Sequence, residues 1–153
     1  MGAYLNSQTP YTLYQSESRS PYFVDKTMLL QELFPYVAAG NRHLCVTRPR
    51  RFGKTIAANM ISSFFQKGID SGELFDRLKI SEADDCQKYK NKYNVMRIDF
   101  SKMPRNCESY RQYIERVEEL LISDLREAYP DAKTSETDAI GDILEAVSYT
   151  HLR

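Results

Sequence analysis

The chain has 153 residues, of which 42% are hydrophobic and 27% are charged, so it is long and apolar enough to bury a core. Its 21 basic and 21 acidic residues cancel, which excludes a whole-protein field that would attract nucleic acid or an anionic membrane. The sequence contains no apolar run that could cross a membrane and no N-terminal secretory signal pattern, so we expect a cytoplasmic protein.

Residues 1–21 are polar and rich in turn-forming residues, so we expect an extended N-terminal arm that lies on the domain. A helix is predicted over residues 27–34, with Asp25 as its N-cap and Pro35 as its end or kink. The expected anchors of the arm are Tyr4, Tyr11 and Tyr14.

Residues 43–47 (HLCVT) contain three consecutive apolar residues, which predicts a strand buried on both faces, as in a parallel sheet. Cys45 is therefore expected in the core as an ordinary thiol, since the spacing of the three cysteines and two histidines disfavours a zinc site or disulfides. An amphipathic helix follows, with Gly68 as its stop. Its apolar residues are Ile56, Met60, Ile61, Phe64 and Phe65.

The second half of the chain predicts one further strand and two helices. Residues 94–100 read as a strand, and Ile80 as a weaker strand-like end after a short turn of helix. The longest helix is expected over about 108–128 and a last one over 136–147, with Ser135 as a possible cap.

The tripeptide Gly53-Lys54-Thr55 stands between the predicted strand 43–47 and the predicted helix, which is the context of a phosphate-binding loop. In such a loop Gly53 lets the backbone approach the phosphates, Lys54 reaches the β- and γ-phosphates, and Thr55 offers its hydroxyl to Mg²⁺. We therefore expect an α/β fold of P-loop NTPase type, a parallel sheet with flanking helices. The expected nucleotide-binding residues are Arg50, Arg51, Phe52, Gly53, Lys54 and Thr55.

The loop departs from the general P-loop pattern, because Arg48 stands where the first glycine belongs and Pro49 removes one N–H donor. One alternative interpretation is a basic turn ahead of a helix. Another is a nucleic-acid-binding module whose phosphate contacts come from a basic cluster. That cluster consists of Arg48, Arg50, Arg51 and Lys54.

Four segments together resemble the AAA-ATPase-like family of bacterial and archaeal P-loop proteins. They are residues 22–27 (YFVDKT), 47–55 (TRPRRFGKT), 74–80 and 93–101, in this order. Arginine is usual at the first loop position of that family, so Arg48 fits the resemblance. The resemblance implies a P-loop fold and ATP binding. Members often continue into a C-terminal PD-(D/E)-x-K nuclease-like domain, so an attached or separate domain of that kind is an expected partner.

Asp25-Lys26-Thr27 has two interpretations, a contact to the nucleotide or the loop, and a helix cap with a surface lysine; the sequence favours the second. The acidic strand that would hold Mg²⁺ is also in question. Asp99 is the one candidate at a predicted strand end, but Arg97 interrupts that strand. No residue matches the family's own acidic strand, so we assign no catalytic residue and leave hydrolysis open.

The last residues, 148–153, fit neither the preceding helix nor the family, and we interpret them as a non-native tail. The expected organisation is therefore an N-terminal arm over 1–21, followed by the N-terminal part of a P-loop ATPase domain over 22–147. On this interpretation the natural protein continues beyond the chain.

Overall fold

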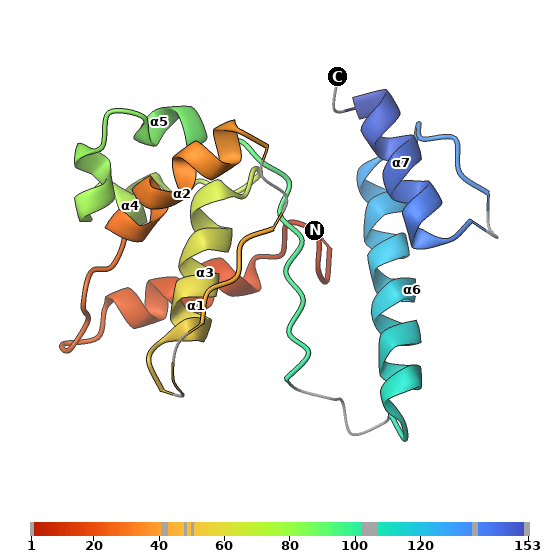
Figure 1. The fold of residues 1–153 in the computed structure, drawn as a ribbon, viewed down its shortest axis with the longest axis horizontal. Coiled ribbons are helices and arrows are strands. Elements are labelled where there is room, and N and C mark those ends of the chain that lie inside the picture. Colours follow the sequence, from red (N-terminus) through yellow and green to blue (C-terminus); the bar gives the residue numbers. More distant parts are fainter. Residues whose placement is uncertain are drawn as a thin grey trace. The chain divides into compact units, whose positions relative to one another are not determined.

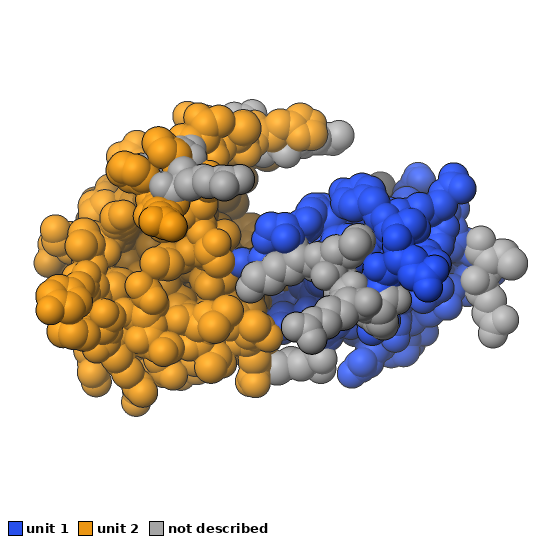
Figure 2. Space-filling model, turned by 90° about the horizontal axis from the view of Figure 1, so that it is seen from below, with its two compact units in different colours: residues 1–7, 96–153 blue, residues 8–95 orange. Residues whose placement is uncertain are grey.

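The computed structural model describes residues 2–40, 43–47, 49, 51–101, 107–135 and 138–151, the last four of these by their backbone alone. The chain divides into two compact units, which Figure 2 colours separately. Unit 1 combines Met1–Ser7 with Met96–Arg153, and unit 2 is the continuous segment Gln8–Val95. The helices of unit 2 are α1 (Thr9–Ser18), α2 (Met28–Ala38), α3 (Lys54–Phe65), α4 (Gly72–Phe75), the 3₁₀ helix η1 (Lys79–Glu82) and α5 (Cys86–Tyr89).

The prediction of an α/β fold with a parallel sheet is wrong. The described residues form helices, and their only β pairing is two isolated bridges, Leu5 with Met96 and Gln66 with Tyr93. Residues 43–47, the expected buried strand, have no bridge partner among the described residues. Their side chains are exposed, including that of Cys45, which was expected in the core. A strand that is buried on both faces needs neighbouring strands, because their backbones form hydrogen bonds with its N–H and C=O groups. An apolar composition alone does not provide such neighbours.

Unit 2 folds around an aromatic core. Phe34 of α2 stacks on Tyr89 of α5, with ring centroids 4.4 Å apart. Phe64 of α3 and Phe75 form a T-shaped pair with ring centroids 5.3 Å apart, and Tyr14 of α1 stacks on the same Phe75 at a centroid distance of 5.7 Å. Helix α1 lies against α3 (Figure 1). These contacts hold the first half of unit 2 against its last helices.

Two local predictions in unit 2 concern prolines. Residues 9–18 form helix α1 rather than part of an extended arm; Pro10 sits in its first turn, where a missing N–H costs no helical hydrogen bond. Helix α2 does not end at Pro35, which was one of the two outcomes expected there, because its face bearing Leu30 and Phe34 is buried in the core and outweighs the cost of the proline. Tyr14, one of the expected anchors, is 1% exposed and is confirmed as one.

Other predictions in unit 2 hold in part. The helix after the loop is confirmed as α3, whose apolar side chains Met60, Phe64 and Phe65 are buried. It ends at Phe65 with Gln66 as its cap, so Gly68, which has a φ of +83°, lies two residues beyond the cap and is not the expected stop. The expected strand-like end at Ile80 is wrong, because Ile80 lies in the 3₁₀ helix η1, where it is fully buried.

The described residues of unit 1 form two long helices, α6 (Tyr110–Ala128) and α7 (Ile140–His151), which pack against each other (Figure 1). Both were predicted, although α7 begins at residue 140 and includes residues 148–151, which we had expected to form a tail. Ser109 caps α6 by accepting a hydrogen bond from the Gln112 N–H. In the described part of the chain, no helix has the length and apolar character needed to cross a bilayer.

A buried carboxylate ties the start of the chain into unit 1. Asp124 of α6, which is 8% exposed, accepts hydrogen bonds from the N–H groups of Ala3 (2.9 Å), Tyr4 (2.7 Å) and Leu5 (3.0 Å). The Tyr4 carbonyl in turn accepts from the Arg97 N–H at 3.1 Å. Unit 1 is therefore built from both ends of the chain.

Candidate functional site

The backbone turns sharply where the loop enters α3. Arg51 has a φ of +67° and Gly53 a φ of +74°, both in the left-handed region that L side chains rarely adopt. The first hydrogen bond of the helix runs from the Ala57 N–H to the Gly53 carbonyl at 2.9 Å, so α3 begins at Lys54. The motif therefore places the helix start where the sequence predicted it.

The start of α3 concentrates positive charge. Its N-cap residue, Gly53, has no side chain that could cap the helix, and the first turn contains no acidic residue. Instead, Lys54 occupies the first helical position and Arg51 stands three residues earlier. The N–H groups of Thr55 and Ile56 meet no acceptor among the described residues. Positive side chains at the positive end of a helix dipole repel that end and destabilise the empty site. A bound anion would interact favourably with both the side chains and the helix end, so the arrangement suits an anion.

A cleft of about 830 Å³ opens beside this helix start, entirely within unit 2. Its size is that of a typical small-molecule site. Of the described residues that line it, three are basic and one, Glu17, is acidic, and the others are mainly apolar. The basic residues are Lys26, Arg51 and Lys54, and the apolar ones include Tyr22, Phe23, Leu44, Val46 and Phe52. The sequence did not predict Tyr22 and Phe23 as residues of the site. They belong to residues 22–27, one of the segments that carry the family resemblance.

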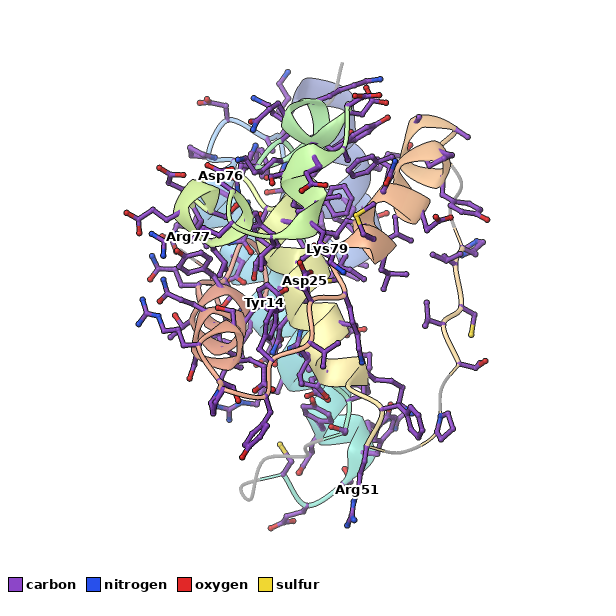
Figure 3. All side chains as sticks on the ribbon, turned by 90° about the vertical axis from the view of Figure 1, so that its left-hand side faces the viewer. Tyr14, Asp25, Arg51, Asp76, Arg77 and Lys79 are labelled. Carbon is purple, nitrogen blue, oxygen red and sulfur yellow. The ribbon has the colours of Figure 1, made fainter. Side chains whose placement is uncertain are left out.

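Asp25 and Thr27 fasten the segment before α2 to the start of η1. Asp25 Oδ1 accepts from the N–H (2.8 Å) and the hydroxyl (2.7 Å) of Thr27, and its Oδ2 accepts from the Lys79 N–H (2.8 Å). Thr27 Oγ1 accepts from the Ile80 N–H at 3.1 Å and is fully buried. Figure 3 shows Asp25 beside Lys79. We call these contacts the Asp25–Thr27 clamp.

The clamp also perturbs the carboxyl group itself. Burial by itself would raise the pKa of Asp25, but the hydrogen bonds from Lys79 and Thr27 outweigh it and lower that pKa below its ordinary value. Asp25 is not the N-cap of α2, because the helix begins after Thr27, which occupies that position. The helix-cap interpretation is therefore replaced by a tertiary contact to η1.

Lys26 points the other way, toward the loop. Its ammonium nitrogen lies 3.9 Å from the point that a Cβ on Gly53 would occupy. The side chain is exposed, and its ammonium has no hydrogen bond or ion pair with another described residue. The structure thus brings the middle residue of the segment Asp25-Lys26-Thr27 to the start of α3, which the sequence left open.

The expected site residues are only partly gathered by the structure. Those that meet at the helix start are Arg51, Phe52, Gly53, Lys54 and Thr55. Arg48 and Arg50 lie outside the described residues. Asp99, the candidate Mg²⁺ carboxylate, belongs to unit 1 and accepts from the N–H (3.0 Å) and hydroxyl (2.6 Å) of Ser101. Within the described ranges, no group of three His, Cys, Asp or Glu side chains is placed to hold a metal ion.

The site thus combines a turn with two residues of positive φ, a helix with a basic start and an adjacent, mainly apolar cleft. Comparison with known families places the whole chain. A family model described as a predicted AAA-ATPase matches residues 14–152, so the chain belongs to the AAA-ATPase-like family. No curated protein and no solved structure matches the chain.

Proposed function

We propose that the chain is a nucleotide-binding part of an ATPase, which holds the phosphates of ATP at the start of α3 together with Mg²⁺. The observation that carries this proposal is the uncapped, acid-free helix start with Lys54 and Arg51 beside a ligand-sized cleft. Membership of the AAA-ATPase-like family supports it.

The residues of the site fit a nucleotide. The phosphates would accept from the N–H groups of Thr55 and Ile56, which have no described acceptor, and would pair with the Lys54 ammonium. The Thr55 hydroxyl, at the second helical position, would hold Mg²⁺, which neutralises phosphate charge when bound. The exposed rings of Phe52 and Tyr22 offer apolar surface for the base.

Calorimetry with Mg-ATP tests the proposal on the full chain. We expect saturable binding that Lys54→Ala weakens at least about tenfold, because a charge-assisted hydrogen bond contributes about 1.5–3 kcal/mol. The matched control is Lys92→Ala, since Lys92 is an exposed lysine of unit 2 that does not line the cleft. Circular dichroism of each variant checks that the helices are retained.

Two results would overturn the assignment. Equal heats from the wild type and Lys54→Ala would show that the nucleotide binds elsewhere. Tight binding of DNA or RNA that Mg-ATP does not displace would favour the alternative, a nucleic-acid-binding module that uses the basic cluster of the loop. Nucleic-acid binding that competes with Mg-ATP would leave the phosphate site in place.

A further inference from the structure

We propose that Lys26 is a second phosphate-binding lysine of this site, which contacts the β- or γ-phosphate of the bound nucleotide together with Lys54. The inference rests on the proposed function, because it names a further ligand-contacting residue of the same cleft. It goes beyond the P-loop motif, since Lys26 lies 28 residues before Lys54 in the sequence (54 − 26).

The position of the ammonium group is the first argument. Lys26 lines the same cleft as Arg51 and Lys54. Its nitrogen lies 3.9 Å from the point that a Cβ on Gly53 would occupy, at the residue directly before the first turn of α3. A phosphate bound by the N–H groups of that turn must lie close to the Gly53 backbone, and so within reach of this nitrogen.

The second argument is that the backbone around Lys26 is already fixed. On one side the Asp25 carboxylate accepts from the Lys79 N–H, and on the other the buried Thr27 hydroxyl accepts from the Ile80 N–H. The Lys26 carbonyl itself accepts from the Leu29 N–H at 3.0 Å. Binding therefore needs to order only the lysine side chain, which lowers the entropy cost of the contact.

Charge is the third argument. Among the described residues that line the cleft, Lys26, Arg51 and Lys54 carry three positive charges and Glu17 carries one negative charge, which leaves two positive charges (3 − 1). The ammonium of Lys26 makes no ion pair with another described residue. Like charges gathered around a helix N-terminus raise the free energy of the ligand-free site and lower that of a complex with a polyanion.

The test compares ligands that differ in phosphate number. Calorimetry with Mg-ATP and with AMP would be run on the wild type, Lys26→Gln, Lys26→Arg and the control Lys92→Gln. We expect Lys26→Gln to weaken Mg-ATP binding about tenfold to a hundredfold and AMP binding much less, because the loss of charge acts on the phosphate chain. Lys26→Arg should restore most of the Mg-ATP affinity, and Lys92→Gln should behave as the wild type.

The failures of the two proposals are distinguishable. If the wild type binds no Mg-ATP, the proposed function itself fails. If Lys54→Ala weakens Mg-ATP binding while Lys26→Gln matches the wild type, only the role of Lys26 fails. If Lys26→Gln weakens Mg-ATP and AMP equally, or if Lys26→Arg is as weak as Lys26→Gln, the residue shapes the cleft rather than contacting phosphate, and the inference is overturned. Thermal melts of each ligand-free variant establish that it is folded.

Discussion

The Asp25–Thr27 clamp predicts that the substitution Asp25→Ala lowers the free energy of unfolding. This change removes three hydrogen bonds at once. The bond to the Lys79 N–H is exposed, so water replaces it and it contributes little to the difference. The two bonds to Thr27 are partly buried. A hydrogen bond to a charged group contributes about 1.5–3 kcal/mol, and partial exposure favours the low end of that range.

We therefore expect Asp25→Ala to lower the free energy of unfolding by about 3 kcal/mol, a large part of the 5–15 kcal/mol typical of a domain. The matched control is Asp70→Ala, because Asp70 makes a single exposed hydrogen bond of the same local kind, to the Gly72 N–H at 2.9 Å. Its loss should change the stability by less than about 1 kcal/mol.

The effect of Asp25 should also depend on pH. The folded pKa of Asp25 lies below its ordinary value of 3.8, so the ionised carboxylate stabilises the folded state. Its contribution is fully present above the ordinary pKa and is lost as the pH falls through the lowered one. The gap in stability between the wild type and Asp25→Ala should therefore be constant near neutral pH and shrink in acid.

Urea unfolding followed by circular dichroism measures these differences, and hydrogen exchange of the peptide containing η1 locates them. Exchange at Ile80 should accelerate in Asp25→Ala and remain slow in Asp70→Ala, because the Ile80 N–H bonds to the hydroxyl that Asp25 holds. Identical unfolding midpoints for the two variants, or a gap that widens in acid, would refute the reasoning.

Two further predictions concern the N-terminus and the loop. Asp124→Ala removes three bonds to the N–H groups of residues 3–5, so we expect a loss of about 3 kcal/mol and rapid hydrogen exchange there; unchanged exchange would contradict the proposed tie. Gly53→Ala and Gly68→Ala should each lower the free energy of unfolding by about 1–2 kcal/mol, because both glycines have a positive φ that strains an alanine. No atom lies within 3.4 Å of either new Cβ, so a steric clash adds nothing to this cost. Only Gly53→Ala should weaken Mg-ATP binding, as measured by calorimetry, and equal affinities in the two variants would argue against a role for the Gly53 backbone.

The parts of the fold that the sequence predicted are those fixed by local pattern. The three- and four-residue spacing of apolar side chains identified α3 and α6, and a Gly-Lys-Thr tripeptide marked the start of α3. Helix α1 escaped prediction because only Pro10 and Tyr14 of its ten residues are buried, which leaves almost no apolar stripe to detect.

The parts that failed depend on partners far along the chain. The apolar run 43–47 has the composition of a buried strand, but pairing decides whether such a run becomes one, and composition says nothing about pairing. A contact of Lys26 with the loop was one of the two interpretations of Asp25-Lys26-Thr27, but the sequence favoured the other, a helix cap with a surface lysine. The approach of Lys26 to Gly53 follows from contacts of its neighbours with Lys79 and Ile80, more than fifty residues away.

The division of the chain into units sets an order for its folding during synthesis. Residues 3–5 are synthesised before unit 2, yet the carboxylate that binds them belongs to Asp124, which is made after the whole of unit 2. Unit 2 is continuous and can close its core as it emerges, whereas unit 1 must wait for its second half. Residues 7 and 96 are closer together once unit 2 is compact than they are when it is unfolded. The two segments of unit 1 can then pair at a lower entropy cost. Residues 3–5, although made before unit 2, can thus take up their final contacts only after unit 2 and α6 have been made.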